Sequence, residues 1–289
     1  MTDALRSFLF VPANQPARIP KALASGADAV ILDLEDTVPA SEKIGARAEV
    51  RAALGLPRDV KLYVRINAID TPHCYPDLIG TIGVGLDGVV APKIESASHI
   101  HTIDWLLRQL ELERGVTQPI DLIPIVETAA GMVQLDAIAN ASPRVRRLTF
   151  GAGDLTRDLG QILTGDEIAI VDARARMTLA SRAAGREPPI DTVYLDVRNL
   201  DGIGQVARTA RVLGFQGKLC IHPDQVAVVN AAFMPSPDEI ARAERILAAF
   251  AKSEAKGIAS IEVDGGFVDY PIVTQAQRIL ALAKRGKRQ

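Results

Sequence analysis

Hydrophobic residues in this chain form short runs of strand length, and segments with a helical pattern separate these runs. The runs lie at residues 7–12, 29–36, 61–67, 88–94, 121–128, 148–150, 190–197 and 218–222. Such alternation is typical of a parallel sheet covered by helices. Eight repeats without a glycine-rich dinucleotide fingerprint favour an α/β fold of the (β/α)8 TIM barrel type over a doubly wound sheet.

The alternation stops near residue 235, and a different arrangement follows. A Ser-Pro-Asp-Glu helix start begins at Ser236, and two strand-like pieces around residues 265–266 indicate a hairpin before a final helix. We therefore expect a barrel domain over residues 1–235 and a C-terminal helix–hairpin–helix extension over residues 236–289. The extension has too little apolar surface to fold alone, so it must pack on the barrel or on a neighbouring subunit.

Two consecutive strand-like runs each end in a carboxylate. Glu127 lies at the end of one run, before a helix that Thr128 can cap, and Asp154 follows the next run through a Gly-Ala-Gly turn. Parallel barrel strands bring their C-terminal ends to one rim, where active sites lie. Two carboxylates there repel each other unless a cation or a shared proton holds them, and Mg²⁺ prefers oxygen ligands. We predict a Mg²⁺ site at this pair, with Mn²⁺ as the alternative cation. Asp154 has a second interpretation as a helix cap.

Strand three carries two polar side chains on one face, because Arg65 and Asn67 are two residues apart. An arginine that points inward near a barrel rim needs an anion, and its planar fork suits a carboxylate or an enolate oxygen. We expect Arg65 to contact substrate. The alternative is a structural ion pair with Asp33, Glu35 or Asp36. We expect Glu35 and Asp36 to orient metal-bound water or Arg65 from behind the site.

Other candidate residues allow two interpretations each. Lys93 at the end of strand four is either a Schiff-base lysine or, as we favour, the partner of a rim carboxylate. We assign it, with the acids of strand two, to the groups behind the site. His222 at the end of strand eight is either a base or a hydrogen-bonded histidine. Asp264 and Asp269 in the hairpin belong either to a solvated turn or to an acid/base group that closes over the rim.

Composition narrows the class of protein. A net charge of −2 and a pI near 6.1 give no support for nucleic-acid binding. Cys74 and Cys220 are far apart and lack metal-ligand spacing, so a reduced cytoplasmic protein is the simplest expectation. We find neither a signal-peptide layout nor a membrane span in the sequence.

An ordered set of motifs resembles the citrate lyase β-subunit-like branch of the HpcH/HpaI aldolase/citrate lyase superfamily, to which malyl-CoA and citramalyl-CoA lyases are related. The motifs are RSFLFVP, DAVILDLEDTVP followed by Lys43 and Arg47, VRIN, APKIE, PIVET, FGAGDLTRDLG, IDTVY, GKLCIHPDQ and VDGGFVDYPIVTQAQRIL. Each is weak alone, but their order along nearly the whole chain is specific. The resemblance implies a TIM barrel whose C-terminal extension closes over a neighbouring subunit's site, usually in a homotrimer.

The resemblance also assigns residues. The family's metal carboxylates fall on Glu127 and Asp154, and Glu127 thereby lies against the substrate as well. The family's substrate-binding arginine falls on Arg65. An aspartate of the extension serves as the acid/base group in the malyl-CoA and citramalyl-CoA lyases, and it matches Asp269.

The implied reaction is a Mg²⁺-dependent retro-Claisen cleavage of a 3-hydroxy-3-carboxyacyl-CoA thioester into an acyl-CoA and a 2-oxo acid. Arg65 would offset the enolate charge, and Asp269 would move the proton. Arg18 and Lys21 are the candidates for binding the phosphates of coenzyme A.

Two alternatives stay open within the resemblance. One is a malyl-CoA-type thioesterase, in which water completes hydrolysis. The other is a citrate lyase β subunit that acts only on an acyl-carrier-protein thioester within a complex. A pyruvate-dependent aldolase of the same superfamily fits less well, because that branch has a histidine base near the second strand, where this chain has LDLEDTV.

Overall fold

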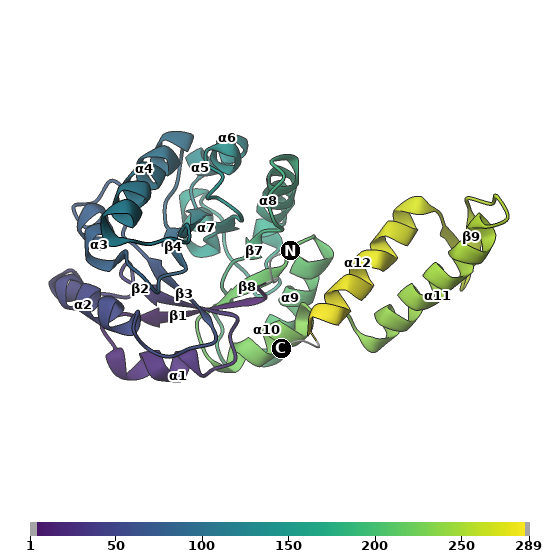
Figure 1. The fold of residues 1–289 in the computed structure, drawn as a ribbon, viewed down its shortest axis with the longest axis horizontal. Helices are drawn as coiled ribbons and strands as arrows, with labels where there is room; N and C mark the ends of the chain where they lie inside the picture. The colour runs from purple at the N-terminus through teal and green to yellow at the C-terminus, as the bar shows by residue number, and fades with distance from the viewer. Residues whose placement is uncertain (1–4, 287–289) are drawn as a thin grey trace. The chain divides into compact units, whose positions relative to one another are not determined.

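In the computed structural model, which describes residues 5–286, eight parallel strands close into a barrel surrounded by helices (Figure 1). The strands follow one another in sequence order, and β1 pairs with β8 to close the ring. They are β1 (Ser7–Pro12), β2 (Ala29–Asp33), β3 (Lys61–Arg65), β4 (Gly88–Ala91), β5 (Asp121–Val126), β6 (Thr149–Phe150), β7 (Ile190–Asp191) and β8 (Gly217–Cys220). The predicted TIM barrel is confirmed.

The helices of the barrel unit lie outside this ring (Figure 1). The α-helices are α1 (Ile19–Leu23), α2 (Lys43–Ala53), α3 (Cys74–Thr81), α4 (Ala97–Arg114), α5 (Ala129–Val133), α6 (Leu135–Asn140), α7 (Ala152–Asp158), α8 (Val171–Ala183), α9 (Leu200–Val212) and α10 (Asp224–Ala232). Short 3₁₀ helices are η1 (Pro16–Arg18), η2 (Ala40–Glu42) and η3 (Ile168–Ile170).

Five strands (β2, β3, β4, β5 and β8) end two or three residues before the predicted runs do, and two other elements differ more. The stretch after β6, where we expected a Gly-Ala-Gly turn, begins the helix α7. Leu155 stabilises this helix by burying its side chain. The sequence did not indicate a helix here, because glycine has a low helix propensity. The seventh strand was predicted to reach residue 197, but β7 ends at Asp191. The next residue, Thr192, accepts a hydrogen bond from the backbone N–H of Ala152 instead of extending the ladder.

Apolar side chains at alternate strand positions fill the barrel. The interior cluster consists of Leu5, Phe8, Ala29, Ile31, Tyr63, Val90, Ile123, Ile125, Ile190 and Leu219. Because the side chains of a strand alternate between its two faces, the next inward-facing positions lie at the C-terminal rim. Asp33 follows Ile31 by two residues, Glu127 follows Ile125 in the same way, and Arg65 occupies the matching place on β3. The strand pattern therefore delivers charged side chains to the rim.

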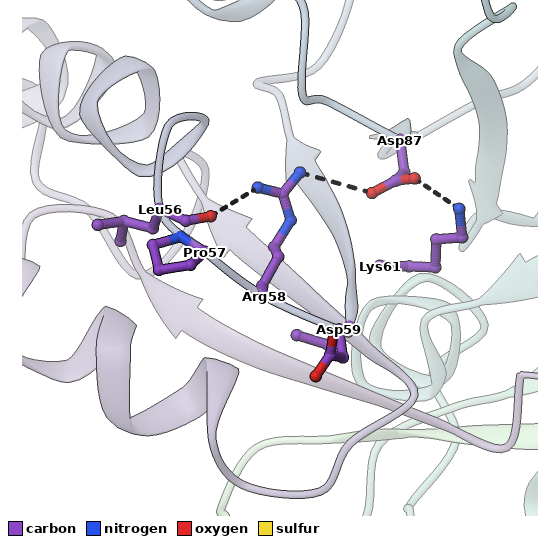
Figure 2. Close-up of a pocket in the computed structure, with 7 residues that line it drawn as sticks. Leu56, Pro57, Arg58, Asp59, Lys61 and Asp87 are labelled. Carbon is purple, nitrogen blue, oxygen red and sulfur yellow. Dashed lines mark hydrogen bonds and ion pairs between the residues drawn. The ribbon is translucent and has the colours of Figure 1, made fainter.

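The opposite end of the barrel carries a surface pocket lined by Leu56, Pro57, Arg58, Asp59, Val60, Lys61 and Asp87 (Figure 2). Lys61 begins β3, and its ammonium pairs with Asp87 at 2.7 Å just before β4. Arg58 donates to the carbonyl of Leu56 at 3.4 Å and pairs with Asp87 at 3.8 Å. The N-terminal face of a TIM barrel serves stability rather than catalysis, so this pocket is no candidate for the chemistry.

The chain divides into two compact units, one reaching to residue 230 and the other starting at residue 231. The second unit contains α11 (Pro237–Glu254), the hairpin of β9 (Ile261–Val263) and β10 (Gly266–Val268), and α12 (Tyr270–Gly286). Ser236 forms the predicted cap of α11, a capping box with Glu239. Ala243, Ile246, Phe250, Val268 and Ala276 make a small core of this unit. In the part of the chain that the structure describes, no helix is both long and apolar enough to span a bilayer.

Candidate active site

Glu127 is the central carboxylate of the rim. It follows β5 directly and is only 4% exposed. Its Oε1 accepts a hydrogen bond from the backbone N–H of Lys93 at 2.9 Å, a residue with the left-handed φ of 52°. A Cβ atom at Gly151 would lie 2.0 Å from Glu127 Oε2, so a glycine is needed there. The backbone N–H that follows β4 thus holds one oxygen of this carboxylate, and the glycine that follows β6 leaves room for the other.

The electrostatic surroundings of Glu127 are unfavourable for its charge. The pKa of Glu127 is raised to about 8, most of all by burial and then by the carboxylates of Glu35 and Asp154, against the opposing hydrogen bond and charge of Lys93. Asp154 lies in the first turn of α7, where its carboxylate pairs with Arg157 at 2.8 Å. The charge of Asp154 thus acts on Glu127, and a cation shared by the two carboxylates stays a prediction.

Arg65 makes an ion pair with two acids of strand two and its loop. Nε and one terminal nitrogen donate to the two oxygens of Asp33 at 2.6 Å each, and the other terminal nitrogen pairs with Glu35 at 3.0 Å. The guanidinium also lies 4.8 Å from the ring centre of Phe10. Burial alone would raise the pKa of Asp33, but the charge and hydrogen bonds of Arg65 outweigh it and lower that pKa. The anticipated alternative, an ion pair, is present; substrate contact by Arg65 stays a prediction.

Lys93 completes the charged network. Its ammonium pairs with Glu35 and lies 3.8 Å from the exposed Asp36. Burial would lower the pKa of Lys93, but its hydrogen bond with Glu35 prevails and raises it. A Schiff-base lysine needs the opposite shift, so the salt-bridge interpretation fits the structure. Burial also raises the pKa of Glu35 despite these cations.

The donors at the rim suit a hard divalent cation. Among residues 5–286, no three histidine, cysteine, aspartate or glutamate side chains form a complete metal site. Mg²⁺, however, commonly takes one or two protein carboxylates and fills its other positions with water and substrate oxygens. The negative charges of Glu35 and Asp154 help raise the pKa of Glu127, and a bound cation would offset this repulsion. Glu127 and Asp154 therefore fit the group that the sequence predicted.

Asp269 belongs to the second unit. It precedes α12, and its Oδ1 accepts a 3.4 Å hydrogen bond from the backbone N–H of Ile272. The other hairpin acid, Asp264, pairs with Arg245 at 2.8 Å and has a left-handed φ of 52°. Asp264 thus has a structural role within the hairpin, whereas a catalytic role for Asp269 stays a prediction.

The remaining candidates have the following places. Arg18 and Lys21 are exposed on η1 and α1, which follow the C-terminal end of β1. His222 is 44% exposed after β8, and its Nδ1 accepts from the backbone N–H of Asp224 at 3.3 Å. Asn67 is buried, and its side-chain amide donates to Asp77 and to the carbonyl of Leu34. Burial raises the pKa of both cysteine thiols to about 12, which keeps them unreactive near neutral pH.

Several supporting residues were missed by sequence reasoning. The buried Lys43 donates its ammonium hydrogens to the carbonyls of Leu34 and Glu35, which holds the loop that carries Glu35. Thr192 anchors the start of α7. The sequence pointed to Lys43 only through its place in the motif after DAVILDLEDTVP. Its partners are backbone carbonyls, and no pattern of side chains in the sequence predicts such bonds.

Comparisons with known proteins place the chain in a family. Residues 6–223 match the HpcH/HpaI aldolase/citrate lyase family. The citrate lyase subunit beta of Leuconostoc mesenteroides subsp. cremoris is 35% identical over 96% of this chain and 93% of that protein. The L-malyl-CoA/beta-methylmalyl-CoA lyase of Cereibacter sphaeroides is 34% identical over 96% and 94%, respectively.

A solved structure agrees with these relatives. The protein CitE from Mycobacterium tuberculosis, in complex with magnesium, acetoacetate and coenzyme A, has a TM-score of 0.82 to this structure. The two are 35% identical, and the match covers 97% of this chain and 98% of that one. The chain therefore belongs to the HpcH/HpaI aldolase/citrate lyase family, as an oxo-acid lyase of the citrate lyase β and malyl-CoA lyase type.

Proposed function

We propose that this lyase uses Mg²⁺ to cleave a 3-hydroxy-3-carboxyacyl thioester of coenzyme A, of the citryl-, malyl- or citramalyl-CoA type. The products are an acyl-CoA and a 2-oxo acid. The observation that carries the proposal is the placement of Glu127 directly after β5 and of Asp154 in the first turn of α7, after the neighbouring strand β6, at the C-terminal rim. The magnesium, acetoacetate and coenzyme A bound by CitE support the choice of cation and substrate class.

Glu127 and Asp154 would hold the cation, which would supply Lewis-acid polarisation of the substrate's hydroxyl and carboxylate oxygens. The protein prepares Glu127 for this role by fixing its direction. The Lys93 N–H holds one oxygen, and the missing side chain of Gly151 leaves room for the other. Such preorganisation avoids the cost of ordering a flexible side chain when substrate arrives.

Arg65 would stabilise the negative oxygen of the departing thioester enolate. A guanidinium has five N–H donors, and the two hydrogen bonds with Asp33 use two of them. Donors that these two bonds do not use would serve the substrate, while the buried Asp33 keeps the group in place at the rim. In this proposal the ion pair orients Arg65 for substrate and does not compete with it.

The extension would supply the proton transfer. We assign the acid/base role to Asp269, in line with the motif match. It would take the proton from the substrate hydroxyl as the carbon–carbon bond breaks and return it to the enolate carbon to give the acyl-CoA. The exposed side chains of Arg18 and Lys21 would contact the phosphates of coenzyme A, since η1 and α1 follow the rim end of β1.

The test runs the reaction in the direction of condensation. The purified chain would be incubated with Mg²⁺, acetyl-CoA and a mixture of glyoxylate, pyruvate and oxaloacetate, and mass spectrometry would search for a condensed thioester. We expect a product that disappears with EDTA and is absent for Glu127→Gln and Asp154→Asn. Its mass would identify the 2-oxo acid. Free coenzyme A together with a hydroxy diacid would instead indicate the thioesterase.

A second candidate has one observation in its favour, because a similar protein is named as a subunit, the citrate lyase subunit beta. In that case the chain would act on a thioester of an acyl carrier protein within a complex. Mg²⁺ binding without any reaction on coenzyme A thioesters, together with co-purification of a small carrier protein, would favour this candidate over the first.

A further inference from the structure

The last residue of α7, Asp158, is bonded to the segment that carries Glu127. Its Oδ2 accepts a hydrogen bond of 2.7 Å from the backbone N–H of Ala129, the first residue of α5. Ala129 lies two positions after Glu127. Asp154 lies one helical turn before Asp158, so the two aspartates project from the same face of α7. Beyond the pairing of β5 with β6, this hydrogen bond therefore connects the two segments that carry the rim carboxylates.

We propose that Asp158 is a positioning residue for the metal site. Its hydrogen bond with Ala129 holds α7 against the start of α5 and so sets the separation of the Glu127 and Asp154 carboxylates. This role rests on the proposed function, because it assumes that these two carboxylates bind the cation.

The helix α7 needs such an anchor. It has seven residues, and a helix of that length does not persist without tertiary contacts. Its first end is held by the hydrogen bond from the Ala152 N–H to Thr192 Oγ1 at 2.9 Å, and its middle by the buried Leu155. Beyond Asp158 the chain runs through the mostly exposed residues 159–166. The contact with Ala129 is thus a restraint at the second end of the helix, in addition to the buried Thr156.

The start of α5 is a suitable fixed point for this restraint. Thr128 caps the helix by accepting from the Gly131 N–H at 3.1 Å. Gly131 packs so closely that a Cβ atom there would lie 2.6 Å from the carbonyl oxygen of Ile94. A segment packed this tightly cannot follow α7 if that helix shifts, so the bond to Asp158 keeps the distance between the two segments constant.

Two substitutions separate the hydrogen bond from the charge of Asp158. Asp158→Asn keeps an acceptor oxygen but removes the negative charge. Ala129→Pro removes the N–H donor but leaves the carboxylate unchanged, and proline is tolerated at the first position of a helix. The preceding Thr128 has φ −134° and ψ 158°, the extended conformation that a residue before proline adopts.

The experiment measures the dissociation constant of Mg²⁺, added as MgCl₂ alone, by calorimetry on the full chain without substrate. We expect Asp158→Ala and Ala129→Pro each to weaken binding about tenfold or more, as loss of a group that orients a ligand does. The double variant should bind no more weakly than either single variant. Asp158→Asn, and Asp136→Ala as a matched exposed aspartate on α6, should stay within about threefold of wild type.

Binding by Asp158→Ala at wild-type strength would overturn the positioning role, and so would an Asp158→Asn variant as weak as Asp158→Ala. If Asp158→Ala fails to fold, as judged by thermal melting, Ala129→Pro decides: wild-type affinity in that variant would reject the role. A wild-type chain that binds no divalent cation would overturn the proposed metal site itself, and with it this role. The two failures are therefore distinguishable.

Discussion

At the scale of single residues, the buried carboxylate of Glu127 should destabilise the protein when no cation is bound. An unfolded glutamate ionises near its ordinary pKa of 4.5, whereas in the folded protein that pKa is about 8. The folded state therefore binds the proton more tightly, and the stability that this gives is present at low pH and is lost as pH rises from 4.5 to 8.

Glu127→Gln removes this penalty while keeping an oxygen to accept the Lys93 N–H. One pKa unit corresponds to about 1.4 kcal/mol, so the variant should exceed wild type by at least about 1 kcal/mol in free energy of unfolding at pH 8 with EDTA. The difference should shrink toward pH 5. Urea unfolding at the two pH values measures it, and a variant no more stable than wild type at pH 8 would contradict the prediction.

Gly151 is the second residue whose identity the site requires. In Gly151→Ala the new methyl group would occupy the place of Glu127 Oε2, so the carboxylate must turn away. We expect weaker Mg²⁺ binding and at least about a tenfold loss of activity. Gly153→Ala is the matched control, because a Cβ atom there meets nothing within 4 Å and alanine favours the helix. Equal effects of the two substitutions would show that the clash is unimportant.

Some residues of the candidate site could be predicted from the sequence, and others could not. Glu127 and Asp154 could be found because each follows a strand-like run, and parallel strands share one rim. Gly151 could be recognised only as a turn residue, since the need for a glycine comes from a side chain contributed by another strand. The hydrogen bond from the Ala129 N–H to Asp158 joins residues 29 positions apart and has no pattern in the sequence.

At the scale of elements, the order of strands was predictable because each strand is a distinct apolar run. The lengths of the shortest elements were not. The predicted strand over residues 190–197 has apolar and polar positions that suit pairing, yet only Ile190 and Asp191 pair, because Thr192 turns to hold α7. Tertiary contacts of this kind override local propensity.

Asp191 also joins three elements of the barrel wall. Its two oxygens accept from Arg174 of α8 at 2.9 Å each, and from Lys218 of β8 at 2.6 Å. Burial would raise the pKa of Asp191, but these two cations prevail and lower it, so its stabilising effect is present above pH 4 and is lost as pH falls below its ordinary pKa.

Asp191→Asn would remove the carboxylate that pairs with the buried Lys218 and would leave Arg174 with Glu167 as its acidic partner. We expect a loss of about 3–5 kcal/mol in free energy of unfolding, measured with urea at pH 7. Asp172→Asn, on the helix α8 that carries Arg174, is the control, since it breaks only an exposed pair with Arg176 and should cost less than about 1 kcal/mol. A loss for Asp191→Asn as small as that of the control would contradict a stabilising role for the network.

At the scale of the whole molecule, the proposed chemistry is distributed over two compact units. The predicted metal carboxylates Glu127 and Asp154 belong to the first unit, and Asp269 belongs to the second. Metal binding and proton transfer should therefore be separable. Asp269→Asn should bind Mg²⁺ as wild type does in calorimetry, but should lose at least about a hundredfold in turnover, the usual contribution of a general acid or base.

Asp264→Asn is the control for this substitution, because it changes the other hairpin acid, which pairs with Arg245. It should keep most of the activity.

Mixing two inactive variants then tests whether the acid/base group comes from another subunit, as the family resemblance implies. Glu127→Gln lacks the metal carboxylate, and Asp269→Asn lacks the acid. If each active site takes its metal carboxylates from one chain and its aspartate from another, some sites in a mixed assembly combine Glu127 of one variant with Asp269 of the other and are intact. Partial return of activity after the mixed variants are dissociated and reassembled is the expected result. Complete inactivity of the mixture, with each variant folded and assembled, would place both groups in one chain or remove Asp269 from the reaction.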